Sequence, residues 1–401
     1  MDTEDLPPPA RADITAYPLE FSGRGGEYFR VWIVNVLLSI VTLGFYTPFA
    51  RRRTAQYFWG HTIVADSPLE FTAQQRRMVV GFLLLVLLYI AFKAAADTGQ
   101  DTVVAVMLFG GAALAPWLWG SAMRFRLQAT RWRGVRLQFV AGWGEVYRAS
   151  WPVFVIALAW TGVLALGPAL LEPKVPVRMQ TGAFGALLGA GVLALLVSVL
   201  CLIRLEFNFK SLLVARSRIG GQPGRWKPVF GDFVRIWLAT LAVFIASVLG
   251  VGMLLAVAWG GSFALFSGQG DKGLLAVLFA IAMAVVTLFI LFLASAPARA
   301  YREARVFRLV WDNIGVSQVA RFRCDLRTGR YVLLRIQNMV LTLLTLGFYR
   351  PFALVAEYRM KVESVTLHVK GGLDQLVGQL TREEQGLGDA MADAVGLDLV
   401  G

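Results

Sequence analysis

The amino-acid sequence predicts an all-α polytopic membrane protein with small cytoplasmic strands between its helical units. Of its 401 residues, 57% are hydrophobic and only 16% are charged, whereas soluble domains carry about a quarter charged residues. Six apolar runs are long enough to cross a bilayer, which takes about 20 residues. Lys and Arg concentrate in alternate connections between these runs, as the positive-inside rule describes for membrane proteins.

The six apolar runs are expected to form six long transmembrane helices, paired as three hairpins. A helix satisfies its own backbone polar groups, so an apolar run of this length is stable in lipid as a helix. Only the first run contains a charged residue, Lys93, near its end. The runs are Met78–Ala96, Thr102–Ala122, Trp151–Leu171, Thr181–Ile203, Ile236–Gly260 and Leu274–Ala298.

The basic residues predict the orientation of these hairpins. The connections 51–77, 123–150, 204–235 and 299–330 carry 5, 6, 7 and 8 Lys/Arg respectively. The alternate connections 97–101, 172–180 and 261–273 carry three in all. The basic connections are therefore expected in the cytoplasm, against anionic lipid head groups of the bilayer. This placement accounts for the net charge of +13, so nucleic acid is not an expected partner.

One apolar stretch occurs twice, near the two ends of the chain. Asn35–Ala50 and Asn338–Ala353 are identical at ten of sixteen positions. Each copy is expected to be an apolar helix that stops at a glycine, Gly44 or Gly347, because glycine adopts the left-handed conformation at helix ends. A proline four residues later cannot continue the helix. We interpret the two copies as an internal repeat.

A wider periodicity surrounds the repeated stretch and divides the chain into about five units. Each unit is expected to contain a short strand, a helix out, a helix back, a basic helix and a polar turn residue. The middle three units contain the long runs, and the first and fifth contain the repeated stretch. The predicted strands start at or near Tyr17–Phe21, Ser67–Phe71, Leu137–Phe139, Pro228–Phe230 and Ala320–Phe322.

The unit pattern leaves two topologies open for the short segments Val31–Leu43 and Tyr331–Leu346. If every unit starts and ends in the cytoplasm, both segments are re-entrant or shallow helices of about 20–25 Å at 1.5 Å per residue. Alternatively, each segment spans the membrane, which gives eight spans and two repeats crossing in opposite directions. We favour the re-entrant arrangement.

The chain is expected to form a single membrane domain over residues 17–377. Residues 1–16 are acidic and rich in proline, which predicts a disordered tail. Met360–Lys370 alternates like a strand, and the acidic tail 378–401 is expected to contain at most a short surface helix from Leu380.

Four stretches together carry a resemblance to a known family: Gly25–Asn35, Thr42–Gly60, Arg124–Gly134 and Thr345–Ala353. They resemble the YjgN family of bacterial membrane proteins. The resemblance extends from about Tyr17 to Val377 and implies a multi-pass protein of the bacterial inner membrane. Family members usually have Asn at the position of His61. The family supplies no catalytic residue.

The residue types needed for catalysis or metal binding are sparse. The two histidines, His61 and His368, lie in different terminal units, and the sequence contains no HExxH motif or Cys/His cluster. The predicted spans contain no Asp, Glu or His, which argues against an intramembrane enzyme and against proton coupling through carboxylates. No enzymatic activity, metal or cofactor is therefore expected.

The candidate functional residues are polar or conformationally special residues near the membrane. Asn35 and Asn338 either line a polar site or tie their helices to a neighbour. The turns after the repeated helices either line a pathway or anchor at the interface; their residues are Gly44, Tyr46, Pro48, Gly347, Tyr349 and Pro351. Candidate contacts to anionic lipid are Arg51, Arg52, Arg53, Arg124, Arg126, Arg302, Arg305 and Arg308.

These observations support two classes of function. A small-solute transporter or channel is favoured, because broken helices and repeats are typical of transporters. The alternative is a non-transporting membrane scaffold or envelope factor that binds anionic lipid or a partner protein. Either protein is compatible with a homo-oligomer.

Overall fold

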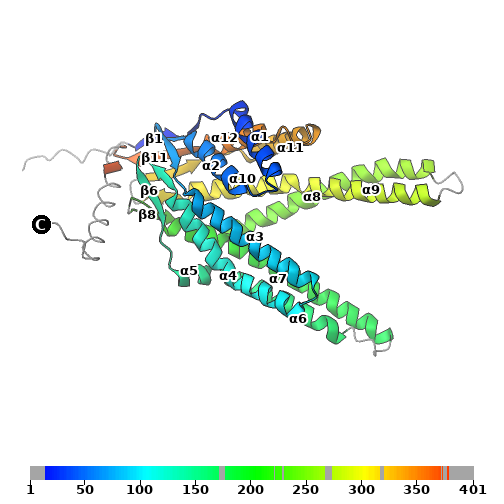
Figure 1. Cartoon of the computed structure of the whole chain (residues 1–401). Helices are drawn as coiled ribbons and strands as arrows, with labels where there is room; N and C mark the ends of the chain where they lie inside the picture. The colour runs from blue at the N-terminus through cyan, green and yellow to red at the C-terminus, as the bar shows by residue number, and fades with distance from the viewer. Residues whose placement is uncertain are drawn as a thin grey trace, which may run out of the picture.

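A computed structural model of the chain has a β-sheet at one end, from which helices extend as arms (Figure 1). The structure describes residues 14–170, 177–220, 222–227, 230–266, 273–316, 320–371, 373 and 377–378. Each group of helices follows one strand of the sheet and precedes another, so every helical segment is connected to the sheet at both ends.

In the described part of the chain, eleven antiparallel strands form one sheet with the order β1-β11-β10-β9-β8-β7-β6-β5-β4-β3-β2. The two strands at the ends of this order, β1 and β2, are separated in sequence only by Leu19. The chain therefore joins the two ends of the strand order directly. The strands are β1 (Ile14–Pro18), β2 (Glu20–Phe21), β3 (Thr62–Val64), β4 (Ser67–Phe71), β5 (Thr130–Trp132), β6 (Val135–Phe139), β7 (Ser217–Ile219), β8 (Gln222–Trp226), β9 (Ile314–Val316), β10 (Ala320–Cys324) and β11 (Val365–Lys370).

The helices lie between successive strand pairs and extend away from the sheet (Figure 1). They are α1 (Gly25–Val41), α2 (Thr47–Gly60), α3 (Gln75–Asp97), α4 (Asp101–Gln128), α5 (Trp143–Ala149), α6 (Trp151–Leu170), α7 (Val177–Ala215), α8 (Phe230–Phe266), α9 (Gly273–Ala294), α10 (Ala296–Asp312), α11 (Thr328–Leu344) and α12 (Arg350–Val362).

Four helices in the described part of the chain are long and apolar enough to cross a membrane, or five if the bent pair α5–α6 is one span. The four candidate spans are Gln75–Asp97, Phe184–Ala215, Phe230–Val257 and Ile281–Asp312. Helix covers each of the six predicted runs where they are described, although the last run crosses the break at Ser295 between α9 and α10. The structure is therefore that of a mainly helical membrane protein, and the count of six spans stays a prediction.

Four of the five predicted strands are present. Ser67–Phe71 is strand β4, and the predictions at Leu137–Phe139 and Ala320–Phe322 lie within β6 and β10. Of the fourth prediction, at Pro228–Phe230, the first two residues lie outside the described residues and Phe230 begins α8, while the described strand of this unit, β8, lies earlier, at Gln222–Trp226. "All-α" also understates the fold, since the short strands pair into one large sheet.

The polar residue that ends each basic helix has a common structural role. Thr62 and Thr130 each donate a side-chain hydrogen bond to the backbone carbonyl four residues earlier, at 2.7 and 3.1 Å. The Asn313 amide makes the same contact at 2.8 Å. These bonds satisfy carbonyls that the helix end leaves without an intrahelical partner. The chain then turns directly into a strand.

The two repeated segments have the same local geometry. Leu43 and Gly44 have φ angles of 49° and 91°, and Leu346 and Gly347 have 51° and 96°. The helices end before these residues, at Val41 and Leu344, so the reversal uses a Leu–Gly pair and not a glycine alone. Beyond each turn, α2 and α12 return to the sheet.

The arrangement of the short helices bears on the two topologies. Helix α1 follows β2 and α2 precedes β3, while α11 follows β10 and α12 precedes β11. All four strands belong to one sheet, so α1 and α11 both leave it and their partners both return to it (Figure 1). The eight-span alternative requires α1 and α11 to cross the membrane in opposite directions, although both helices leave the same sheet.

The ends of the chain meet at the sheet. Strand β1 begins at Ile14, inside the segment expected to be disordered, and pairs with β11 from Ile14–Lys370 to Pro18–Thr366. The strand expected over Met360–Lys370 starts later, at Val365, because α12 continues to Val362. Residues 1–13 and 379–401, with the helix expected from Leu380, lie outside the described residues.

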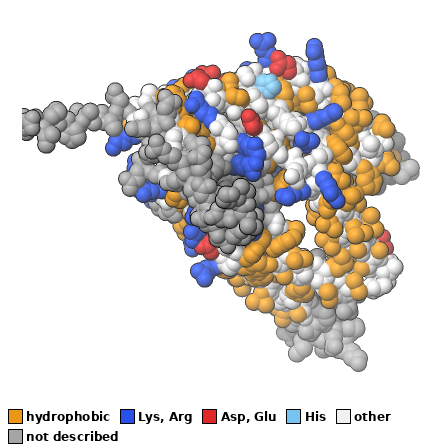
Figure 2. Space-filling model, turned by 60° about the vertical axis from the view of Figure 1, so that its left-hand side comes forward, with side chains coloured by type: hydrophobic (Ala, Val, Ile, Leu, Met, Phe, Trp, Pro, Cys, Tyr) orange, Lys and Arg blue, Asp and Glu red, His pale blue; other side chains and the backbone are white. Residues whose placement is uncertain are grey.

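The main core lies between the sheet and the helices α1, α2, α10, α11 and α12, and includes the fully buried Tyr331 and Val369. The three long helix pairs α3–α4, α6–α7 and α8–α9 are called the arms. In contrast to the core, the arms are apolar on their surfaces: Leu158 and Leu254 are 74% and 73% exposed. Figure 2 shows Lys and Arg gathered at the sheet end, while hydrophobic side chains cover the arms. Basic and apolar side chains are thus separated, as expected of a protein whose arms face lipid.

Candidate functional site

Asn35 and Asn338 are buried at equivalent positions of the repeated segments, with 6% and 3% exposure. Asn35 Nδ2 donates to the carbonyl of Ala50 at 3.4 Å, and Asn338 Nδ2 donates to the carbonyl of Ala353 at 3.3 Å. Each amide therefore connects its outgoing helix to the returning helix of the same unit.

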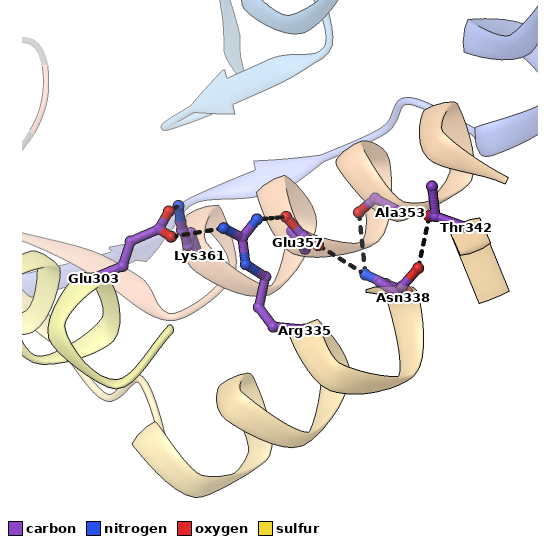
Figure 3. Close-up of polar contacts among 7 residues, drawn as sticks. All are labelled: Glu303, Arg335, Asn338, Thr342, Ala353, Glu357 and Lys361. Atoms are coloured by element: carbon purple, nitrogen blue, oxygen red, sulfur yellow. Dashed lines mark hydrogen bonds and ion pairs between the residues drawn. The ribbon is translucent and has the colours of Figure 1, made fainter. Parts of the chain in front are cut away.

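In the C-terminal segment the amide belongs to a larger polar network (Figure 3). Asn338 Nδ2 also donates to Glu357 Oε1 at 3.1 Å. The other carboxylate oxygen of Glu357 pairs with Arg335, whose guanidinium lies 3.2 Å from Glu303. Lys361 completes the network by pairing with Glu303. The network joins α10, α11 and α12.

Charge balance explains how this network is accommodated. Burial opposes the charged form of Arg335, but the carboxylates of Glu357 and Glu303 outweigh it and raise the pKa of Arg335. Burial, followed by the nearby charge of Glu303, raises the pKa of Tyr331 well above its ordinary value. The guanidinium therefore stays charged and the phenol stays neutral at physiological pH. Buried charges are retained when they are paired in this way.

Each buried amide lines a cleft. The N-terminal cleft, with a volume of about 890 Å³, is lined by Asn35 and other residues of α1 and α2, by Phe71 of β4 and by residues of α3 and α4. The C-terminal cleft, of about 340 Å³, is lined by Asn338 and other residues of α11 and α12, and by Ala296 and Arg299 of α10. Volumes of this order are typical of small-molecule sites.

The turns predicted as site residues lie at the ends of the two short hairpins. Pro48 and Pro351 are buried, and Tyr46 and Tyr349 stack on Phe49 and Phe352. The tips themselves are strongly exposed, with Leu43 at 90% and Leu346 at 91%. Gly44 and Gly347 supply the left-handed backbone that reverses the chain. This geometry suits an apolar tip inserted into lipid, with tyrosines near it.

The predicted lipid-contact arginines on α10 have partners within the protein. Arg302 pairs with Glu206 at 3.3 Å, and Arg308 pairs with Asp312 at 3.4 Å. Arg305 donates to a tyrosine hydroxyl one turn earlier at 3.3 Å. The contact to Glu206 joins α10 to α7, and the other two contacts lie within α10. Each contact uses part of the hydrogen-bonding capacity of its guanidinium group.

The arginines of α2 and α4 differ in their surroundings. Arg53 lies over the ring of Tyr46, and Arg124 lies over a tryptophan ring. The Arg52 Nε is buried without a hydrogen-bond partner in the described structure. Arg51 and Arg126 are exposed, line the N-terminal cleft and form no ion pair with any described residue. The structure thus brings two of the predicted arginines together with Asn35.

Sequence reasoning missed the carboxylates and the cations of the network. Glu357, Glu303 and Lys361 lie outside the predicted membrane segments, and Arg335 lies within the short segment Tyr331–Leu346. Glu357 is nevertheless buried, because α12 packs beside α11 and brings Arg335 and Asn338 to it. An isolated acidic residue within the basic helix that follows the second repeat was the available signal.

The two histidines lie in separate surroundings. His61 Nδ1 is 2.7 Å from the Tyr57 carbonyl, and His368 lies in β11. Among the residues that the structure describes, no group of three His, Cys, Asp or Glu could hold a metal ion.

The basic connections at one sheet and the apolar helices that extend from it define a mainly helical membrane protein. The family described as "Bacterial protein of unknown function (DUF898)" matches residues 16–394. The chain therefore belongs to this family, and the resemblance to YjgN is confirmed by relatives that carry that name.

The relatives are bacterial proteins named "Inner membrane protein YjgN". The protein of Salmonella typhimurium strain LT2 is 27% identical over 141 residues, which is 35% of each chain. The proteins of Escherichia coli O157:H7 and of strain K12 are 25% and 27% identical over 127 residues, or 32% of each chain. The similarity thus spans about a third of these relatives. No solved structure matches the chain.

Proposed function

We propose that this protein is a non-transporting membrane scaffold that binds anionic lipid at its cytoplasmic face. The observation that carries this proposal is the divergence of apolar arms from a basic sheet end. The most apolar window of each candidate span is at most 17% buried. Such arms offer their surfaces to lipid or to another chain, and the arginines at their base lie where anionic head groups lie.

A small-solute transporter or channel is the rival proposal. It requires polar groups along a path through the spans. The buried polar or charged residues of the described chain lie outside the four candidate spans: Asn35, Thr62, Thr130, Ser150, Asn338 and Glu357. Their position favours a role at the base of the arms.

We also infer that the five units are copies of one repeat. The matching φ angles and Asn–Ala hydrogen bonds of the two terminal units support this inference. The two terminal units then contain two versions of one site. The version at Asn338 contains the carboxylate of Glu357, and the cleft at Asn35 is lined by no carboxylate of the described chain. The proposal includes a homo-oligomer, in which a second copy of the chain covers part of the apolar arm surface that lipid would otherwise contact.

The proposal is tested by the lipid that the full-length protein retains. Protein solubilised in mixed micelles of equimolar phosphatidylcholine and phosphatidylglycerol is purified, and its bound lipid is quantified by mass spectrometry. We expect several-fold enrichment of phosphatidylglycerol, because each arginine near the surface favours anionic lipid by about 1 kcal/mol. Equal retention of both lipids, or saturable solute uptake by proteoliposomes, would contradict the proposed function.

A further inference from the structure

The N-terminal and C-terminal clefts are built on corresponding positions of the repeated segments. Asn35 and Ala50 line the first cleft, and Asn338 and Ala353 line the second. In both, the amide nitrogen donates to the alanine carbonyl. The clefts differ in size, at about 890 and 340 Å³. The same position of the repeat therefore faces a cleft twice, in one large and one small version.

The chain's own carboxylate enters the C-terminal cleft. Glu357 accepts a hydrogen bond from Asn338 Nδ2 at 3.1 Å and pairs with Arg335 (Figure 3). The amide thus uses both of its N–H groups, one for Ala353 and one for the carboxylate. This cleft is an internal example of an anion bound at the amide of the repeated segment.

The N-terminal cleft has no such carboxylate. The positions that correspond to Glu357 and Arg335 are occupied by Thr54 and Trp32, which both line the cleft. Asn35 is more than nine-tenths buried, yet its Oδ1 has no hydrogen-bond partner in the described part of the chain. A buried polar atom without a partner is unfavourable, so this oxygen marks a place for a donor from outside the chain.

The charge and the apolar wall of the N-terminal cleft define the chemistry of an occupant. Arg51 and Arg126 contribute two exposed guanidinium groups that no described carboxylate neutralises. Most of the remaining lining is apolar and includes Phe58 and Phe125. Ile40 lines the cleft and is 67% exposed on the apolar surface of α1, so the cleft is continuous with a lipid-facing surface.

We infer that the N-terminal cleft binds one anionic membrane lipid whose head group carries a hydroxyl, the chemistry of phosphatidylglycerol. Its phosphodiester takes the place that the Glu357 carboxylate has in the C-terminal cleft, beside the amide N–H and the two arginines. The head-group hydroxyl donates to Asn35 Oδ1, and an acyl chain follows the apolar wall. This inference rests on the proposed function and assigns its lipid to a specific site.

The test is native mass spectrometry of the full-length protein titrated with single lipids. We expect one phosphatidylglycerol to bind more tightly than phosphatidylcholine. Arg51→Gln and Arg126→Gln each weaken it about fivefold, from about 1 kcal/mol per arginine. Thr54→Glu abolishes this binding, because it supplies the carboxylate found in the C-terminal cleft. Arg321→Gln is the matched control, since Arg321 is an exposed arginine of strand β10 that does not line the cleft, and it leaves binding unchanged.

A second comparison tests the hydroxyl contact. Phosphatidylethanol carries the same singly charged phosphodiester without a head-group hydroxyl, so it binds more weakly than phosphatidylglycerol. This difference disappears in Asn35→Leu if Oδ1 accepts from the alcohol. Unfolding midpoints of all variants are measured in the same detergent, and the two exposed arginine variants report on the site even if Asn35→Leu is unstable.

The outcomes separate this inference from the proposed function. Anionic-lipid enrichment that is unchanged by Arg51→Gln, Arg126→Gln and Thr54→Glu overturns the site and leaves the scaffold proposal intact. Absence of any preference for anionic lipid overturns both. Displacement of phosphatidylglycerol by soluble sn-glycerol 3-phosphate identifies a free phosphate ester as the occupant and overturns the assignment to a lipid.

Discussion

At the scale of single residues, Glu357 links the polar groups of two helices. It accepts from Asn338 and pairs with Arg335 on α11. Arg335 then reaches Glu303 on α10, which also pairs with Lys361. A buried charge of this kind is stable only while its partners remain in place. The packing of α10, α11 and α12 therefore depends on a few polar contacts as well as on apolar surface.

Replacing Glu357 tests this dependence. Glu357→Gln removes the charge that faces Arg335, and we expect it to lower the free energy of unfolding by about 2 kcal/mol, as for hydrogen bonds to charged groups. The control is Glu363→Gln, whose partner Arg359 is 3.7 Å away in a pair whose side chains are 43% and 49% exposed. The control should cost at most about 0.5 kcal/mol. Denaturant unfolding in detergent measures both, and equal losses would show that the network contributes nothing special.

At the scale of secondary-structure elements, side-chain bonds at helix ends connect the arms to the sheet. Thr130 Oγ1 donates to the Arg126 carbonyl at 3.1 Å and also accepts from the Trp59 indole at 3.1 Å. It therefore ends α4 and connects it to α2. Thr62 and Asn313 make the corresponding bond to the carbonyl four residues earlier at the ends of α2 and α10.

Thr130→Val removes both bonds with little change in volume. We expect a loss of about 1–2 kcal/mol in the free energy of unfolding, because the indole N–H loses its acceptor inside the protein. Thr98→Val is the control, since Thr98 makes the same bond to the carbonyl four residues earlier but is exposed at the far end of α3. Chemical unfolding of the two variants should differ clearly. Similar curves would refute the role given to Thr130.

Replacement of glycine by alanine is expected to lower the stability in a turn of a short hairpin and not to lower it within a long helix. Gly44 has φ +91°, where an added Cβ is strained, so Gly44→Ala should destabilise by about 1 kcal/mol. Gly81 lies within helix α3, with nothing near an added Cβ. Gly81→Ala should be neutral or stabilise by up to about 1 kcal/mol. Thermal unfolding of both variants checks the signs, and destabilisation by Gly81→Ala alone would contradict this account of the turn.

Local patterns predicted the elements better than they predicted the site. Apolar length identified the arms, and alternation identified strands such as Ser67–Phe71. The strand Gln222–Trp226 was misplaced because its Pro and Gly suggested a loop, although Gly224 fits closely against the Val214 carbonyl there. The Glu357 network could not be predicted, since it depends on α10, α11 and α12 packing side by side. Asn35 and Arg126 were recognised separately, but only the fold places them at one cleft.

At the scale of the whole molecule, the sheet makes the five units depend on one another. Strand β1 pairs with β11 near the end of the chain, and β2 continues from it to pair with β3. The first and last units therefore lie together, and α1 packs beside α12. Because every pair of helices starts from this sheet, we propose that the sheet lies in the cytoplasm and that both short hairpins enter the membrane from that side.

Cysteine accessibility measures this topology directly. Single cysteines replace the exposed residues Glu20, Asp66, Lys370 and Thr98, one at a time, in a chain whose two native cysteines are changed to serine. A membrane-impermeant maleimide is applied to spheroplasts before and after permeabilisation. The account predicts that Thr98→Cys reacts from outside, while the other three react only after permeabilisation. Labelling of Glu20→Cys and Lys370→Cys from outside, with Asp66→Cys protected, would show eight spans and contradict the single cytoplasmic sheet.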